Sequence, residues 1–375
     1  MSVPIVQGWC PGAHRPMMSG DGLVVRVRPR LARMRTAQAL GLCTLAERFG
    51  NGTIDLTNRA NLQLRGVSEG NHQPLLAELA ALDFLDAEPG IEVRRNILFS
   101  PLYREGELTA RLGCELTARL GELPALPAKF GFAIDTGAGR LLTADSADIR
   151  LERGTDSLIL RADGMATGRE VTEGEAIDRL IQLARWFADR FTPDTRRMAR
   201  LVQAEPLPAD WQGAEPGPVD EPLGPGDTPL GPLYGAAFGQ LPARALATLL
   251  RDSGAIGLRV TPWRLILLEG AQAIPAPEFV SQTGDPLLTT DACPGAPYCP
   301  QAQAETRDLA RALAGRVSGS LHVSGCAKGC ARMGPADITL IGREGRFDLV
   351  RRGRAGDEPC QRGLTPETLK TMDLT

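Results

Sequence analysis

The sequence predicts an α+β protein built as two related halves with pseudo-two-fold symmetry. Two segments match in length and pattern: residues 54–66 are IDLTNRANLQLRG, and residues 258–270 are LRVTPWRLILLEG. Alternating apolar and polar side chains in the first segment favour a half-buried strand. Residues 206–232, between the two segments, are rich in proline and glycine, which predicts a linker from one half to the other. The chain is therefore expected to repeat one arrangement of helix, turn and strand on either side of a linker.

A short amphipathic helix is expected before each repeat. The first covers residues 36–49 and ends at a glycine turn that begins with Gly50. The second covers residues 242–252, with Pro242 as its first helical residue, and ends before Gly254. Helix, turn and strand thus follow one another in both halves.

Two further elements are predicted outside the repeats. Thr172 and Glu175 form a capping-box pattern, and apolar residues recur at helical spacing from Ile177 onward, which indicates an amphipathic helix. Near the C-terminus, the segment ADITLIGREGRFDLVRRG is typical of a hairpin with Gly345 in its turn.

Composition narrows the class of protein. The chain has 375 residues, too many for one compact core. Its formal net charge is −3, so it lacks the overall positive charge that is typical of nucleic-acid-binding proteins. An anionic ligand would have to be held by a local basic cleft. The sequence shows no signal-peptide pattern and no apolar stretch of membrane-spanning length, so we expect a cytoplasmic protein without a membrane or nucleic-acid partner.

Four of the eight cysteines stand in two pairs near the C-terminus. Cys293 and Cys299 lie in ACPGAPYCP, and Cys326 and Cys330 lie in HVSGCAKGCA. Four thiolates with flanking prolines and glycines are typical of a [4Fe-4S] site, where backbone must approach the sulfides closely. The alternatives are a structural zinc, for which tighter C-x₂₋₄-C pairs are usual, and four unrelated thiols. Of the other four cysteines, Cys43 is expected to be a core residue. No part in the site is expected for Cys10, Cys114 or Cys360.

The cysteine quartet, the duplicated halves and LTNRANLQLRG together resemble the sulfite and nitrite reductase superfamily over nearly the whole chain. Within that superfamily, CPGAHRPMMSGDGLVVRVRP, LTNRANLQLRGV and HVSGCAKGCA most resemble the precorrin-3B synthase family. The resemblance implies duplicated reductase-like halves, each made of a ferredoxin-like half-domain and an α/β lobe. The expected parts are a half-domain over 1–85, a lobe over 86–205, the linker over 206–232, a second half-domain over 233–285, and a second lobe over 286–375 that carries the four cysteines.

The resemblance also suggests site residues. Arg59 and Arg95 stand where the siroheme reductases have their first two active-site arginines, and Lys129 matches the first lysine of their K-F-K pattern. Gly131 replaces the second lysine. A small, doubly charged oxyanion needs converging cations, so this departure weakens the case for sulfite as substrate. Arginines would equally bind the carboxylates of a tetrapyrrole that lies where the reductases hold siroheme.

The implied activity is that of a monooxygenase in cobalamin biosynthesis. It hydroxylates precorrin-3A at C20 and forms a lactone from the ring-A acetate, using dioxygen and electrons from NADH. Because no dinucleotide or flavin fingerprint is present, we expect an external electron donor, a reductase or a ferredoxin. Two alternatives remain open: a siroheme-dependent sulfite or nitrite reductase, and a non-enzymatic iron-sulfur electron carrier.

A mononuclear non-haem iron is also attributed to this type of enzyme. The sequence has three histidines and no two-His-one-carboxylate spacing. His14 and His322 are the candidates for contact with such an iron or with the substrate, and a purely structural role is the alternative for His322. We therefore expect substrate or solvent to complete the ligand set of any such iron.

Overall fold

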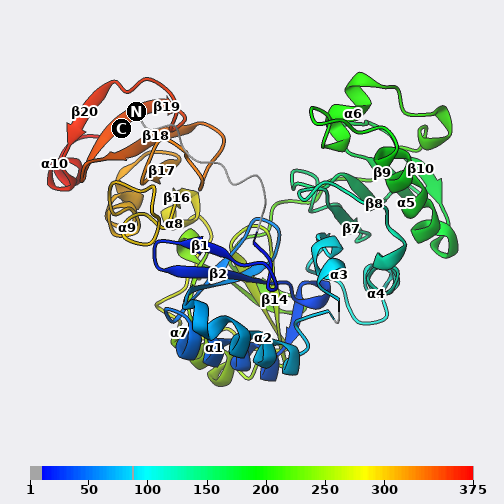
Figure 1. Cartoon of the computed structure of the whole chain (residues 1–375), viewed down its shortest axis with the longest axis horizontal. Helices are drawn as coiled ribbons and strands as arrows, with labels where there is room; N and C mark the ends of the chain where they lie inside the picture. Colours follow the sequence, from blue (N-terminus) through cyan, green and yellow to red (C-terminus); the bar gives the residue numbers. More distant parts are fainter. Residues whose placement is uncertain (1–10, 87, 375) are drawn as a thin grey trace.

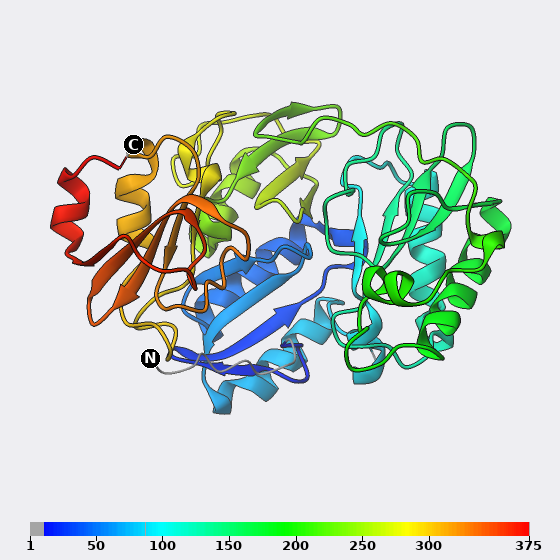
Figure 2. The ribbon, with the colours of Figure 1, turned by 90° about the horizontal axis from the view of Figure 1, so that it is seen from above.

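The computed structural model describes residues 11–86 and 88–374 of the chain. Within these residues, four five-stranded sheets form a central body and two lobes. Figure 1 shows the lobes on opposite sides of the central body, lobe 1 (residues 89–204) in cyan to green and lobe 2 (residues 286–371) in yellow to red. Seen from above, in Figure 2, the three parts form a row with the central body in the middle. Cys10 lies outside the described residues.

The central body contains both repeats. The first half consists of β1 (Met17–Ser19), β2 (Gly22–Val27), β3 (Arg33–Arg35), α1 (Thr36–Phe49), β4 (Thr53–Leu56), β5 (Leu62–Val67) and α2 (Glu69–Ala81). The second consists of β11 (Gly226–Thr228), β12 (Gly231–Gly235), β13 (Gln240–Pro242), α7 (Ala243–Asp252), β14 (Gly257–Val260) and β15 (Leu265–Glu269). Helices α1, α2 and α7 lie on one side of the two sheets (Figure 1).

The two halves exchange strands. Their sheets run β1-β2-β5-β4-β13 and β11-β12-β15-β14-β3, so each sheet takes its last strand from the other half. Leu241 of β13 pairs with Ile54 of β4, and Met34 of β3 pairs with Leu258 of β14. All four side chains are buried, so neither half completes its sheet or its core alone.

The duplication extends to single hydrogen bonds. In the turn of the first repeat, Thr57 Oγ1 accepts the N–H of Asn61 at 3.2 Å, and in the second Thr261 Oγ1 accepts the N–H of Leu265 at 3.2 Å. The glycines that end the two repeats both have positive φ, 72° and 65°, which explains why glycine stands at both positions.

The lobes share one topology. Lobe 1 contains α3 (Pro89–Arg94), β6 (Ile97–Phe99), α4 (Leu108–Ala118), β7 (Phe132–Asp135), β8 (Ile149–Arg153), β9 (Leu158–Ala162), β10 (Arg169–Val171), α5 (Glu173–Ala188) and α6 (Met198–Ala204). Lobe 2 contains α8 (Pro286–Thr289), β16 (Thr290–Ala292), α9 (Arg307–Leu313), β17 (Leu321–Ser324), β18 (Ala336–Arg343), β19 (Arg346–Gly353), β20 (Gln361–Leu364) and α10 (Pro366–Thr371). In each sheet the first three strands are parallel and the last two are antiparallel. The predicted α+β class with pseudo-two-fold symmetry is confirmed.

Most predicted elements form where expected. Helix α1 has the predicted bounds, Thr172 and Glu175 form the capping box of α5, and Gly345 takes positive φ in the β18–β19 turn. Each repeat proves to be two strands joined by a turn. Pro242 lies one residue before its predicted place, as the N-cap of α7, because it also ends β13. The end of the proline- and glycine-rich segment forms β11 and the start of β12.

Two large apolar cores support these parts, with two smaller clusters beside them in the described residues. The larger one joins the central body to lobe 1, and lobe 2 has its own. Cys43 is buried in the larger core, where burial raises the pKa of its thiol to about 12, as expected of an inert core residue. Among the described residues, no helix is both long enough and apolar enough to cross a membrane.

Candidate functional site

The four C-terminal cysteines lie on two loops at the carboxyl ends of parallel strands. Cys293 directly follows β16, and Cys326 and Cys330 follow β17. Cys293 is buried, Cys299 and Cys326 are half-buried, and Cys330 is exposed. Desolvation by the surrounding chain raises the pKa of the Cys326 and Cys330 thiols, although the Cys330 residue as a whole is exposed, and the charges of neighbouring thiolates in the quartet raise it further. The two loops therefore bring these thiols close enough for their charges to interact.

The backbone around the cysteines suits an inorganic cluster. The N–H of Gly325 donates to Cys293 Sγ at 3.2 Å, the type of contact that stabilises a bound thiolate. A Cβ on Gly325 would lie 2.7 Å from Ala302 Cβ, and one on Gly295 would lie 2.6 Å from Thr306 Oγ1. Glycine is thus required where these loops approach their neighbours. In the part of the chain that the structure describes, no group of three or more His, Cys, Asp or Glu side chains is arranged to hold a single metal ion.

The first cysteine loop contacts the central body. The N–H of Gly20, in the β1–β2 turn, donates to the carbonyl of Tyr298 at 3.1 Å, and a Cβ at position 20 would lie 2.4 Å from Pro297 O. Arg65 Nη2 donates to the same Tyr298 carbonyl at 3.1 Å and forms an ion pair with Asp21 at 3.1 Å. Arg65 is 7% exposed, so this arginine of the first repeat fixes the position of lobe 2 against the central body.

His322 is buried beneath the second cysteine loop. Its side chain is 0% exposed, and a Cβ on Gly329 would lie 3.5 Å from its Cε1 atom. Neither ring nitrogen has a hydrogen-bond partner in the structure. Burial lowers the pKa of His322, and Asp291, its cross-strand neighbour, opposes that shift. The ring is therefore a buried polar group with neither nitrogen satisfied, beneath the loop that carries Cys330.

A basic cavity of about 600 Å³ opens between the N-terminal segment, β2, the first repeat and lobe 1. Its size is within the usual range for small-molecule sites. Five of its side chains are basic and one is acidic; the lining includes His14, Arg15, Arg26, Arg28, Arg59 and Glu92. This balance favours a ligand with several carboxylates.

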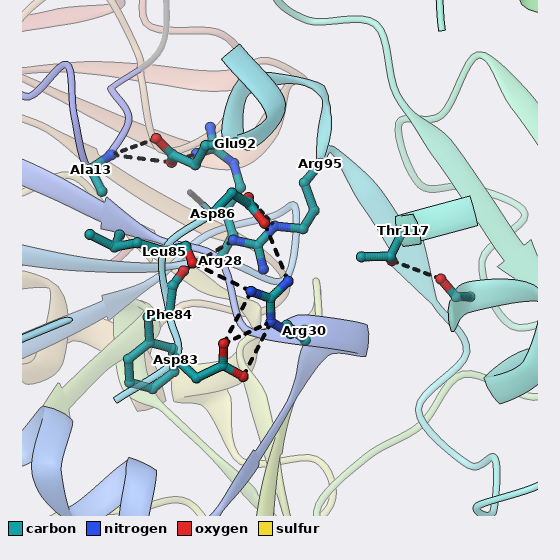
Figure 3. Close-up of polar contacts among 11 residues, drawn as sticks. Ala13, Arg28, Arg30, Asp83, Phe84, Leu85, Asp86, Glu92, Arg95 and Thr117 are labelled. Atoms are coloured by element: carbon teal, nitrogen blue, oxygen red, sulfur yellow. Dashed lines mark hydrogen bonds and ion pairs between the residues drawn. The ribbon is translucent and has the colours of Figure 1, made fainter. Parts of the chain in front are cut away.

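Glu92 organises the wall of this cavity. It is 2% exposed on α3 and forms a buried ion pair with Arg28. Its carboxylate also accepts the N–H of Ala13 at 3.2 and 3.3 Å. These contacts join α3 to Arg28, directly after β2, and to the N-terminal segment (Figure 3). Glu92 thereby fixes the segment that carries His14, whose Nε2 is buried without a hydrogen-bond partner.

Arg59 and Lys129 come together at the edge of the cavity. Arg59, in the β4–β5 turn, donates from Nη2 to the carbonyl of Lys129 at 3.0 Å and to Ser146 Oγ at 3.3 Å. The side chain of Lys129 is exposed. These contacts anchor the first repeat on lobe 1, and Arg59 is one of the residues that line the cavity.

Arg95 is not among the residues that line the cavity. It is 5% exposed, forms an ion pair with Asp86 at 3.1 Å, and donates from Nη2 to Phe84 O at 3.0 Å (Figure 3). Burial lowers its pKa. The cavity is instead lined by the next residue, Asn96.

Gly131 stands where a side chain has no room. A Cβ there would lie 2.7 Å from Asn96 Nδ2 and 3.0 Å from Asn96 O. The N–H of Gly131 donates to the buried carboxylate of Asp148 at 2.9 Å. The local packing therefore leaves no room at position 131 for the second lysine of the reductases.

The basic residues Arg15, Arg26 and Arg28 did not emerge from sequence reasoning as site residues. The pattern GLVVRVRP offered a signal, since Arg26 lies on β2 and Arg28 follows two residues later, directly after the strand ends at Val27. Only the packing of α3 against β2 reveals that this segment borders a cavity.

The fold and the family model define the class of protein. Residues 15–82 match the nitrite/sulfite reductase ferredoxin-like half domain. The solved structure of the Mycobacterium tuberculosis NirA protein superposes with a TM-score of 0.63 at 19% identity, covering 93% of this chain and 79% of that one. The chain thus has the nitrite and sulfite reductase fold.

Full-length sequence comparisons are more specific. The chain is 32% identical to a precorrin-3B synthase from a Sinorhizobium species, over 94% of this chain and 84% of that protein. It is 25% identical to a ferredoxin–nitrite reductase of Synechococcus elongatus, over 91% of this chain and 80% of that protein. The chain belongs to the precorrin-3B synthase family, within the nitrite and sulfite reductases.

Proposed function

We propose that this chain is an oxidoreductase that hydroxylates precorrin-3A at C20, with closure of a lactone from the ring-A acetate, in cobalamin biosynthesis. The observation that carries the proposal is the basic cavity, in which Arg15, Arg26, Arg28 and Arg59 line one space of about 600 Å³. A tetrapyrrole with many carboxylates matches several separate arginines better than a small oxyanion does. Gly131 adds support, because its packing excludes the second lysine of the anion reductases.

In this proposal the arginines bind and orient the substrate. Arg59 and Arg28 hold carboxylates at two sides of the macrocycle, and Glu92 holds the Arg28 guanidinium in place. Lys129 lies at the edge of the cavity beside Arg59, where its ammonium can pair with a further carboxylate. Arg95 positions the loop before α3 through Asp86, at a distance from the reacting atoms.

Cys293, Cys299, Cys326 and Cys330 are the proposed ligands of a [4Fe-4S] cluster, which supplies single electrons when bound. One oxygen atom of O₂ enters the substrate and the other leaves as water, with two electrons from an external donor and two protons. His14 is the candidate in the cavity for contact with a mononuclear iron or with the substrate, since its Nε2 is buried without a partner.

The test starts with protein purified without oxygen. Four irons and four sulfides per chain, a cluster absorbance without a siroheme band, and a product 16 Da heavier than precorrin-3A under oxygen are the expected results. With ¹⁸O₂ one labelled atom should enter the product. Stoichiometric siroheme with nitrite- or sulfite-dependent electron uptake would instead establish the reductase alternative, which the 25% identity to a nitrite reductase supports. If the cluster transfers electrons but the protein catalyses neither reaction, the remaining hypothesis is a non-enzymatic electron carrier.

A further inference from the structure

His322 is a fully buried side chain with two unsatisfied nitrogens. It lies on β17 in register with Asp291 of β16 and Thr339 of β18. Asp291 is already engaged by Arg264 at 3.3 Å and Arg332 at 3.0 Å, and neither nitrogen of His322 has a partner. Buried polar groups in native proteins are nearly always hydrogen-bonded, so such a group indicates a partner that binds there.

The other lobe shows how the equivalent place is used when no cysteines are present. There the second residue of β7 is Ala133, and its neighbour on β8 is Arg150. The buried guanidinium of Arg150 donates to the carbonyls of Leu142 at 2.8 Å and Asp145 at 2.5 Å, and so ties down the loop after β7. In lobe 2 the residue equivalent to Arg150 is Thr339, and the residue equivalent to Ala133 is His322, beneath the loop after β17.

The loop over His322 is the one that carries Cys326 and Cys330. A Cβ on Gly329, the residue before Cys330, would lie 3.5 Å from Cε1 of the ring, which places this loop next to His322. The same Cβ would lie 2.9 Å from Ala355 Cβ, so the loop has no room for a side chain at position 329.

We infer that His322 donates a hydrogen bond from a ring N–H to a sulfur of the group held by the four cysteines, either a sulfide or the thiolate of Cys330. This inference rests on the cluster assigned in the proposed function. A hydrogen bond to sulfur stabilises the more negative, reduced state of a cluster and raises its reduction potential. His322 is therefore a positioning residue that tunes the electron source.

The direct test uses the full chain labelled with [¹⁵N]histidine and pulsed EPR of its reduced cluster. The chain has three histidines, and we expect a ¹⁵N coupling that persists in His72→Gln and disappears in His322→Gln, where the new amide is unlabelled. A loaded wild-type cluster without any ¹⁵N coupling would overturn this inference alone. A chain that binds no iron and sulfide would overturn the cluster assignment as well.

A redox titration provides the second readout. His322→Leu removes the donor and should lower the midpoint potential, whereas His322→Gln keeps an N–H donor and should stay closer to wild type. Thr339→Val is the matched control on the neighbouring strand, because its hydroxyl already donates to Gly353 O at 2.8 Å and should not affect the cluster. Equal potentials in wild type and a fully loaded His322→Leu variant would contradict the inference, and the ¹⁵N experiment on wild type decides the matter if that variant fails to load.

Discussion

Arg59 and Trp263 occupy equivalent positions in the two repeats, and both hydrogen-bond to adjacent residues of lobe 1. Each stands two residues after the threonine that caps its turn. Arg59 donates to Ser146 Oγ at 3.3 Å, and Trp263 Nε1 donates to Asp145 Oδ2 at 3.0 Å. The dipeptide Asp145–Ser146 therefore holds both halves of the central body against lobe 1, although only the first half presents an arginine to the cavity.

Replacing Arg59 should impair substrate binding more than folding. Arg59→Ala removes a guanidinium from the cavity, and we expect kcat/KM for the tetrapyrrole to fall by about tenfold or more through loss of a charge-assisted pair. Arg48→Ala is the control, since Arg48 forms an exposed ion pair with Glu78 away from the cavity. Equal steady-state kinetics of the two variants would remove Arg59 from the site.

The burial of Asp145 should make stability depend on pH. Burial raises the pKa of Asp145 to about 6, despite the Trp263 hydrogen bond. A carboxyl whose folded pKa is raised binds its proton more tightly in the native state, so its contribution to stability is full below about pH 4 and is lost as the pH rises to about 6. Asp145→Asn should therefore be more stable than wild type at pH 7, by on the order of 1 kcal/mol after solvent screening, and similar near pH 4. Urea unfolding at both pH values checks this; a variant destabilised at pH 7 would refute it.

Breaking the buried pair of Glu92 should affect both stability and the cavity. Glu92→Gln removes the carboxylate of the buried Glu92–Arg28 ion pair, and breaking a buried ion pair typically costs about 3 kcal/mol or more. The urea midpoint should drop, and substrate KM should rise because the N-terminal segment loses part of its anchor at Ala13. Glu88→Gln, at the exposed start of the same helix, should change neither quantity. A Glu92→Gln midpoint within error of wild type would contradict this account.

Position 131 should reject even a methyl group. Gly131→Ala places a Cβ 2.7 Å from Asn96 Nδ2, and overpacking of this kind costs about 1–3 kcal/mol. Gly121→Ala is the matched control, because its Cβ would meet only Ile91 Cδ1 at 3.9 Å. Thermal unfolding compares the two; a stable Gly131→Ala variant would mean that Asn96 moves aside readily.

Removing one proposed ligand should abolish the cluster. Cys330→Ser is expected to lose most iron and sulfide, because serine oxygen is a poor ligand for soft iron–sulfur clusters. Cys360→Ser, an exposed cysteine of the same lobe, should keep them. A Cys330→Ser variant with a full [4Fe-4S] signal and unchanged turnover would show that Cys330 is not a ligand.

Local patterns made much of the fold readable from the sequence. The two repeats, the helix over 36–49 and the hairpin around Gly345 depend on periodicity and turn chemistry, which neighbours along the chain decide. The exchange of β3 and β13 between the halves could not be predicted, because strands of three residues carry too little pattern to specify a partner.

The candidate site divides in the same way. Cysteine spacing alone pointed to the quartet, and motif resemblance pointed to Arg59 and Lys129, which the structure brings together. The same resemblance pointed to Arg95, whose guanidinium forms an ion pair with Asp86 and does not line the cavity, so its role stays a prediction. Arg26 and Arg28 became site candidates only through their neighbours in space.

By itself, the sequence determined the duplicated α+β architecture, the two cysteine loops and the family, because each depends on the order and spacing of residues that are close along the chain. Only the tertiary structure decided which arginines border the cavity, why position 131 has no side chain, and that His322 lies unsatisfied beneath Gly329. The physical reason is that burial and partner choice arise where distant segments meet, and a buried charge or N–H group is defined by those neighbours.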